Sequence, residues 1–141
     1  MVVMAIDYGD AHTGVAISDP TGFLAGTTTT IHSRKAEVVL EELARLVREH
    51  RVERLVMGFP RNMDGTEGPR AQLYRDFAAR VTEATGVEPV LWDERRTTVD
   101  AHRILFDAGK NAKKRKQTVD AVAAALILEG YLDFQRMRQT P

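Results

Sequence analysis

The sequence predicts an α/β protein built on one five-stranded mixed sheet with helices on both faces. The first observation behind this prediction is that short segments of strand character alternate with longer segments of helical periodicity. The second is that three strands come first, separated by turns alone, whereas the last two strands are separated by helices. Strands joined by tight turns pair antiparallel, and strands joined through a helix run parallel by right-handed crossovers. The expected sheet is therefore an antiparallel meander followed by parallel strands.

The strands are expected from apolar or β-branched runs that are bounded by turn signals. The first run is continuously apolar, which is typical of a strand covered on both faces. A threonine-rich run follows the turn signal at residues 19–22 and has the composition of a strand. The expected strands are residues 2–6, 14–18, 24–31, 55–58 and 88–92.

The helices are expected from apolar side chains that recur along one helical face. One helix carries Leu73, Phe77 and Val81 on that face, and Gly86 supplies its stop. The last helix is almost entirely apolar, so it should be well buried. The expected helices are residues 35–50, the helix marked by residues 73–81, residues 98–108 and residues 118–132.

Two fold families fit this order of elements, the flavodoxin-like sheet and the RNase H-like sheet. The opening antiparallel meander favours the RNase H-like sheet, because the flavodoxin-like sheet is mostly parallel. We expect one domain spanning residues 1–141, since this length is ordinary for a single core and the chain has no linker, internal repeat or low-complexity tract.

The composition excludes several classes of protein. The absence of cysteine excludes a disulfide scaffold, thiolate metal sites and cysteine nucleophiles. No apolar segment approaches the roughly 20 residues of a membrane span, and residues 2–6 are too short for the core of a signal peptide. We therefore expect a soluble protein of the cytoplasm that does not engage a membrane.

The charge is balanced overall but not along the chain. Twenty basic and twenty acidic residues give a formal net charge of zero, which argues mildly against a nucleic-acid binder, because such proteins are often basic. Residues 110–116, with the sequence KNAKKRK, nevertheless form a local basic run. Local patches decide contacts, so the run keeps nucleic acid open as a partner.

Three acidic residues, Asp7, Glu94 and Asp120, stand where a strand is expected to end or a helix to begin. Sheets of α/β proteins place their ligand sites at the carboxyl ends of strands. Each residue also has a structural explanation: a turn for Asp7, a capping turn for Glu94 and a favourable helix-dipole position for Asp120. Against the last explanation, Asp120 extends an apolar stripe at i+4, i+7 and i+11, where a carboxylate is costly unless it is paired or bound to metal.

Asp93 and Glu94 are neighbours at the end of the last expected strand. Strand alternation sends their side chains to opposite faces, so only one of them can easily join Asp7. We choose Glu94 as the residue that faces the site.

The chemistry of three convergent carboxylates is that of a metal centre. They would repel one another without a cation, and hard oxygen ligands select Mg²⁺ or Mn²⁺. Two such ions about 3.5–4 Å apart activate the attacking water and stabilise the leaving oxygen in phosphodiester cleavage. The four histidines show no zinc spacing. We therefore expect Asp7, Glu94 and Asp120 to be both the catalytic residues and the ligands of Mg²⁺ or Mn²⁺, with two ions bound.

Four stretches of the sequence resemble the YqgF family of RNase H-like proteins: AIDYGDAHTGVAISDPTG, VMGFPRNMDGTEGPRA, LWDERRTT and VDAVAAALILEGYL. The resemblance runs nearly end to end, and the stretches come in the family's order. That family is described as candidate pre-16S ribosomal RNA nucleases and Holliday-junction resolvase-like proteins. The resemblance implies an RNase H-like fold, a cytoplasmic location, nuclease activity on structured nucleic acid and a role in 5′ maturation of pre-16S ribosomal RNA. By motif position, the family's acidic residues fall on Asp7, Glu94 and Asp120.

The sequence departs from the family pattern at two places. The family often has a basic pair two positions after the first glycine, where this chain has Ala11 and His12, which puts a phosphate contact there in doubt. Phe59 replaces a common leucine, which is a conservative change in packing. Neither departure touches the acidic residues.

Further residues are expected to contact the substrate. The loop at residues 60–69 could approach a sugar-phosphate backbone through its amides, and the basic run before the last helix could bind phosphates, although a run of charge is often only a solvated loop. We interpret Trp92 as a core residue rather than a base-stacking one. The expected substrate-binding residues are Asn62, Gly65, Arg95, Lys113, Lys114, Arg115 and Lys116.

Three other functions fit parts of the pattern. A Holliday-junction resolvase-like DNA endonuclease is the alternative within the family. An actin-like or sugar-kinase-like ATPase also opens with an Asp-x-Gly turn, but such proteins resemble two linked copies of the fold, and this short chain has no second such motif. A non-catalytic module that binds ribosomal RNA is disfavoured, because all three acidic residues are present.

Overall fold

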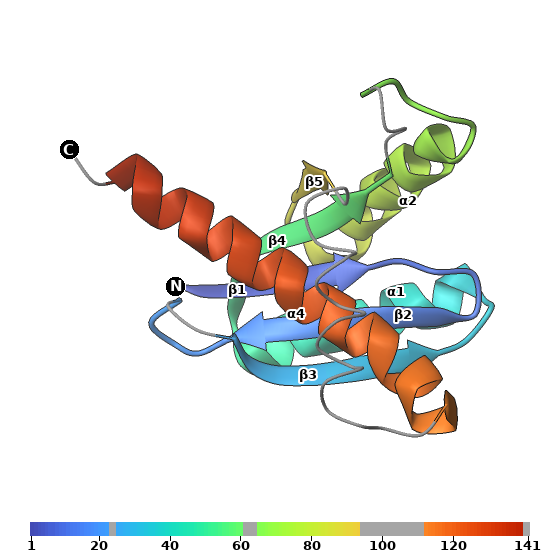
Figure 1. Cartoon of the computed structure of the whole chain (residues 1–141), viewed down its shortest axis with the longest axis horizontal. Coiled ribbons are helices and arrows are strands. Elements are labelled where there is room, and N and C mark those ends of the chain that lie inside the picture. Colours follow the sequence, from blue (N-terminus) through green and yellow to red (C-terminus); the bar gives the residue numbers. More distant parts are fainter. Residues whose placement is uncertain (23–24, 61–64, 94–111, 140–141) are drawn as a thin grey trace.

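The chain forms the predicted mixed sheet with helices packed on both of its faces (Figure 1). The computed structural model describes residues 1–22, 25–60, 65–93 and 112–139, and for residues 112–120 and 138–139 it describes the backbone alone. The strands are β1 (Val2–Asp7), β2 (His12–Ser18), β3 (Ala25–His32), β4 (Val52–Phe59) and β5 (Pro89–Asp93). The helices are α1 (Ala36–His50), α2 (Arg70–Thr85) and α4 (Ala112–Gln139).

The strand order in the sheet is β3-β2-β1-β4-β5. β1 pairs antiparallel with β2, and β2 pairs antiparallel with β3, as expected for strands joined by tight turns. β4 lies parallel to β1 and to β5, because α1 reverses the chain before β4 and α2 reverses it before β5. The prediction of a meander followed by parallel strands is confirmed, and β1 is the central strand.

Two hydrophobic cores lie on opposite faces of the sheet. The core under α1 and α2 includes Met4, Ile6, Leu43 and Phe77. The core under α4 includes Val3, Ala5, Val56, Trp92, Ala124, Ile127 and Leu128. α4 crosses the front of the sheet in Figure 1, and α1 lies behind it. Because both faces are covered, β1 is apolar at every position from Val2 to Ile6, as its sequence predicted.

The alternation along β1 decides which way its last residue faces. Met4 and Ile6 point into the core under α1 and α2, whereas Val3 and Ala5 point into the core under α4. Successive side chains of a strand point to opposite faces. Asp7 therefore belongs to the α4 face of the sheet.

The second helix is correctly predicted, except for one of its inward side chains. Leu73 is 46% exposed, and Tyr74 is buried in its place beside Phe77 and Val81. The spacing from Tyr74 to Phe77 and Val81 is i, i+3 and i+7, which is as good a helical face as the predicted one. Tyr74 takes the inner position because its hydroxyl reaches a backbone carbonyl of the sheet edge, so burying it leaves no polar atom unpaired.

The last helix begins earlier than predicted, at Ala112 rather than at residue 118, and it ends at Gln139 rather than at residue 132. The basic residues 113–116 therefore lie in the first turns of α4 and not in a loop before it. Lysine and arginine are good helix formers, and neither glycine nor proline interrupts residues 112–129. The predicted helix over residues 98–108 lies outside the described residues. Within the described ranges, no helix combines the length and the apolar character needed to cross a bilayer.

Two buried hydroxyls in β2 give a testable contrast in stability. Thr13 is fully buried on the α1 side, and its hydroxyl has no hydrogen-bond partner among the described residues. A Thr13→Val change should therefore raise the free energy of unfolding by about 1 kcal/mol, since it removes an unpaired polar group at nearly constant shape.

Ser18 is the matched control. Its hydroxyl accepts the Val3 N–H at 2.9 Å and donates to the Asp19 carbonyl at 2.9 Å. Ser18→Ala should lower the free energy of unfolding by about 1–3 kcal/mol, because the buried Val3 N–H is left unpaired. Urea denaturation of both variants tests the pair of predictions. Equal losses of stability would mean that the Thr13 hydroxyl is satisfied after all.

Candidate active site

The candidate site lies at the edge of the sheet where β1, β4 and β5 end. Asp7 is the last residue of β1, is half-buried, and pairs with Gly14 of β2. On the other side, Ile6 pairs with Met57 of β4. Asp7 therefore lies level with Gly58, the residue that follows Met57 and pairs with Trp92 of β5. Neighbouring strands are about 4.8 Å apart, so the ends of β1 and β5 are separated by roughly 10 Å.

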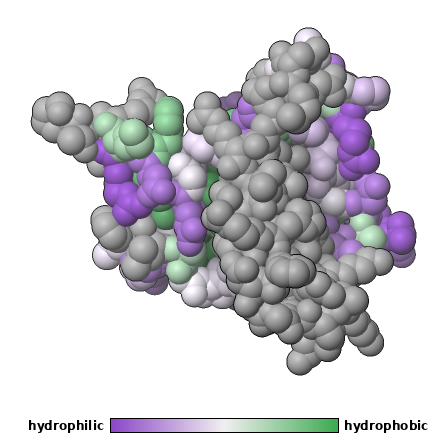
Figure 2. All heavy atoms as spheres, viewed as in Figure 1, coloured by the Kyte–Doolittle hydropathy of each residue, from purple (hydrophilic) through white to green (hydrophobic). Residues whose placement is uncertain are grey.

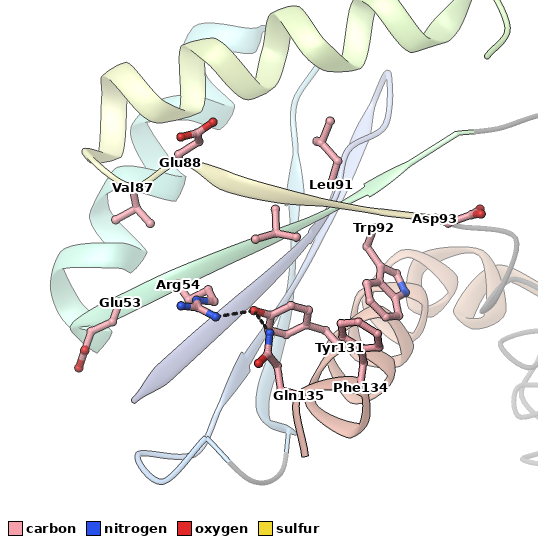
Figure 3. Close-up of a pocket in the computed structure, with 11 residues that line it drawn as sticks. Glu53, Arg54, Val87, Glu88, Leu91, Trp92, Asp93, Tyr131, Phe134 and Gln135 are labelled. Carbon is pink, nitrogen blue, oxygen red and sulfur yellow. Dashed lines mark hydrogen bonds between the residues drawn. The ribbon is translucent and has the colours of Figure 1, made fainter. Parts of the chain in front are cut away.

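The side chains of β5 alternate across the sheet in the same phase. Leu91 points toward the α2 side and Trp92 toward α4 (Figure 3). Trp92 packs edge-on against Tyr131 and Phe134 of α4, with ring centroids 5.9 and 5.7 Å apart, and it is 9% exposed. The interpretation of Trp92 as a core residue is confirmed. Its side chain is on the same face of the sheet as Asp7.

Asp93 ends β5, and the predicted site residues Glu94 and Arg95 lie outside the described residues, as does Asn62. The structure therefore describes Asp7 as the one carboxylate of the predicted acidic set whose side chain it places. Among the described residues, no group of three or more histidine, cysteine, aspartate or glutamate side chains could hold a metal ion. The predicted set of Asp7, Glu94 and Asp120 stays a prediction. A half-buried carboxylate at a strand end does fit an oxygen-preferring cation.

Asp120 is the ninth residue of α4, counted from Ala112, and not a residue of its first turn. The stripe that it was predicted to extend is buried: Ala124 is 0%, Ile127 is 1% and Tyr131 is 3% exposed. Because the favourable effect of a helix dipole falls off within the first turn, the dipole no longer explains an aspartate at this position. The side chain of Asp120, like those of Lys113 to Lys116, is not described.

The first turn of α2 is tied to the turn between β1 and β2. Tyr74 donates its hydroxyl to the carbonyl of Tyr8 at 2.7 Å, and the ring of Tyr8 stacks on that of Phe77 with centroids 3.7 Å apart. Arg70 lies 3.4 Å from Asp10 in an exposed ion pair. These contacts hold the segment that follows Asp7 against α2. The end of β1 is therefore anchored to this helix.

Arg70 is a candidate functional residue, beside the turn that follows β1, that the sequence analysis missed. Hydrogen bonding to Tyr74, followed by electrostatic attraction to Tyr74 and Asp10, raises the pKa of Arg70 above its usual range, so the side chain stays cationic. Hydrophilic side chains gather along the part of the molecule formed by the β1–β2 turn and α2 (Figure 2). The signal for Arg70 was its place directly after Pro69, at the start of a helix that follows a glycine-containing loop.

Gly65 is the described member of the predicted substrate loop. Its φ is 89°, in the left-handed region that favours glycine. A side chain at this position would be strained, which explains a glycine in the loop without reference to a ligand. Its predicted contact with substrate remains a prediction.

The hollow beside Trp92 is not a good place for a phosphate backbone. It has a volume of about 720 Å³ and lies between β5 and the second half of α4 (Figure 3). Among the described residues its charged lining consists of Glu53, Glu88, Asp93 and one cation, Arg54, which donates to the Tyr131 hydroxyl at 2.7 Å. An acidic lining repels phosphates unless a cation compensates it, so the hollow by itself does not favour a phosphate backbone.

Comparison with known proteins identifies the family. Residues 1–134 match the family model described as "RuvX: Holliday junction resolvase". The chain belongs to the RuvX family. This confirms the resemblance that was found in the sequence, and it puts the chain among nucleases, which are hydrolases that act on the ester bonds of nucleic acids.

Relatives of the RuvX chain match it over almost its whole length. It is 43% identical over 135 residues to a protein of Carboxydothermus hydrogenoformans, covering 96% of this chain and 98% of that one. It is 42% identical over 138 residues to a protein of Desulfitobacterium hafniense, covering 98% and 96%. Both relatives are named as candidate pre-16S rRNA nucleases.

Solved structures agree on the fold. RuvC of Thermus thermophilus, in complex with a Holliday junction substrate, superposes with a TM-score of 0.59 at 18% identity and covers 97% of this chain and 96% of that one. The Holliday junction resolvase of fowlpox virus superposes with a TM-score of 0.58 at 12% identity, covering 95% and 99%. The predicted RNase H-like fold is confirmed.

Proposed function

We propose that this RuvX protein is a metal-dependent nuclease of the cytoplasm that hydrolyses phosphodiester bonds of structured RNA, with the precursor of 16S ribosomal RNA as its substrate. The observation that carries the proposal is Asp7, a half-buried carboxylate at the carboxyl end of the central strand. The substrate is supported by the names of full-length relatives at 42–43% identity.

The proposed metal centre consists of Asp7, Glu94 and Asp120, which would hold one or two Mg²⁺ or Mn²⁺ ions. When bound, these ions would supply an activated water and stabilise the leaving oxygen of the phosphodiester. The role of the chain's own residues is to hold the metal ligands in place. Asp7 is fixed by pairing with β2, and the tie between Tyr74 and Tyr8 holds the residue that follows it.

The alternation along β5 supports the choice of Glu94 over Asp93. Trp92 lies on the α4 face, the face to which Asp7 belongs, and Leu91 lies on the other. Residues two apart on a strand share a face. A strand phase carried on from Trp92 would give Glu94 the face of Asp7, and it would give Asp93 the face of Leu91.

A second candidate substrate is a four-way DNA junction. It is favoured by the description of the family and by the likeness in fold to a resolvase solved with a Holliday junction. The deciding experiment is cleavage of a defined precursor RNA and of a synthetic junction, each with and without Mg²⁺ or Mn²⁺. We expect RNA cleavage that depends on the ion. Cleavage of the junction alone would favour the DNA function, and cleavage of neither would favour an RNA-binding module without catalysis.

The basic run at the start of α4 is expected to bind phosphates without taking part in the chemistry. Changing Lys113 and Lys114 together to Ala should weaken RNA binding and leave the rate at saturating substrate little altered. Released counterions make such binding depend on salt, and each lost phosphate contact should lower the salt slope by about one unit. Fluorescence anisotropy over a salt series measures this slope.

The control for this prediction is Arg136→Ala, which removes a cation near the other end of the same helix, where Arg136 pairs with Asp133. It should leave both the affinity and the slope unchanged. Equal slopes for the wild type and the lysine variant would mean that the run is only a solvated part of α4. Surface changes of this kind usually alter stability by no more than about 0.5 kcal/mol, so the fold should persist.

A further inference from the structure

Two histidines face each other, one at the first position of β2 and one at the last position of β3. His12 pairs with His32 in the register of these strands. Their Nδ1 atoms are 2.9 Å apart, and their rings meet edge-on with centroids 4.9 Å apart. The pair is exposed to solvent. The backbone beyond it is fixed as well, because the Ser33 N–H donates to the Ala11 carbonyl at 3.1 Å.

The pair belongs to the α4 face of the sheet. The neighbouring pair, Thr13 and Ile31, is buried on the α1 side, so alternation puts both imidazoles on the opposite face. Asp7 pairs with Gly14, two residues from His12, and belongs to that same face. No function assigned above uses either histidine.

The contact between the two Nδ1 atoms requires that one imidazole donates a hydrogen and the other offers a lone pair. The two nitrogens are thus aimed at one small region of space and held there by paired strands. Imidazole nitrogens held in this way are typical ligands of divalent transition metals. Magnesium prefers oxygen ligands and would not compete for them.

We propose that His12 and His32 form a two-histidine site for a divalent transition metal such as Ni²⁺ or Cu²⁺. Sites of this kind bind divalent first-row metals most tightly at the Ni²⁺ and Cu²⁺ end of the series. The 2.9 Å between the two Nδ1 atoms is the length of the hydrogen bond that joins the rings, and both nitrogens can reach one ion once that hydrogen has moved to Nε2. Among the described residues no group of three metal-binding side chains is present, so the described part of the chain supplies two ligands to this site.

Binding changes the tautomer of one ring. The imidazole that carried its hydrogen on Nδ1 must carry it on Nε2 instead, so that both Nδ1 lone pairs face the metal. A neutral pair therefore binds the ion without net release of protons.

Isothermal titration calorimetry of the full chain with NiCl₂ and with CuCl₂ tests the proposal. Apart from any ion held by the proposed carboxylate centre, we expect one ion per chain to bind in a histidine-dependent event. We expect His12→Gln and His32→Gln each to weaken this event by at least about tenfold, the smallest loss usual for groups that support a metal site. The control is His50→Gln, which removes the histidine at the C-terminal end of α1, whereas His32 precedes the N-terminal end of that helix, and it should leave binding unchanged. Asp7→Asn should also leave it unchanged, which separates this site from the proposed nuclease centre.

Three outcomes would overturn the two-histidine site. These are full binding by the His12→Gln, His32→Gln double variant, an equal loss in His50→Gln, and a loss in Asp7→Asn that the histidine variants do not share. Circular dichroism spectra of all variants exclude unfolding as the cause of a loss. Because His32 is exposed and His12 is only half-buried, glutamine at these positions should leave the fold intact.

Discussion

An Asp7→Asn variant is expected to fold like the wild type and to lose cleavage of precursor RNA by more than about 100-fold, the upper end of the losses seen when outer-shell partners of a metal are changed. Asparagine keeps the shape of the side chain but removes the negative charge that a divalent cation requires. The core does not depend on that charge, because Asp7 follows the buried part of β1 and both cores are made of apolar side chains.

The measurement combines initial cleavage rates over a range of Mn²⁺ concentrations with thermal unfolding followed by circular dichroism. Asp10→Asn is the matched control: Asp10 is three residues further on, and its side chain is 69% exposed in a pair with Arg70. This control should keep most of the activity, since an exposed ion pair contributes only about 0–1 kcal/mol. An active Asp7→Asn variant, or an unfolded one, would remove Asp7 from the metal centre.

The second large effect is expected from a comparison of Glu94→Ala with Asp93→Ala. Glu94→Ala should lower cleavage by about 100-fold or more, because it deletes a proposed ligand of the metal. Asp93→Ala should change it far less, because the phase of β5 assigns Asp93 to the face of Leu91 and away from that of Asp7. The prediction thus depends on the observation that Trp92 lies on the α4 face of the sheet.

Cleavage rates and the Mn²⁺ concentration at half-maximal rate should be measured for both variants. Loss of activity in Asp93→Ala with an active Glu94→Ala would show that the chain shifts phase by one residue after β5. Trp92→Phe is a useful companion, because it keeps the ring in the core while leaving both acidic residues untouched. It should retain activity at a modest cost in stability.

The sequence was sufficient to predict the sheet, because each strand carries its own signal. β1 is apolar throughout, β3 is rich in threonine, and turn residues separate the first three strands. Inner faces were harder to predict: Leu73 and Tyr74 are adjacent, and a hydrogen bond across the molecule decided between them. The start of α4 was misplaced because charged residues were read as a loop, although lysine and arginine are good helix formers.

The surroundings of the site depend on contacts between distant segments, which local patterns do not contain. Arg70 meets Asp10 across 60 positions of sequence, and His12 meets His32 across 20. The His12–His32 contact required the register of β2 on β3, which the sequence fixes only through the turn between them. A zinc spacing is a pattern along the chain, whereas this pair is formed across two strands.

The position of α4 after all five strands has a consequence for synthesis on the ribosome. One core can close early, since α1, β4 and α2 all precede residue 86. The other core contains Val3, Ala5 and Val56 but is covered by residues 124–132 of α4. Until that helix leaves the exit tunnel, the nascent sheet presents an apolar face to its surroundings, and transiently exposed apolar surface invites aggregation or capture by chaperones. A transcript cut short before α4 would leave that face permanently bare.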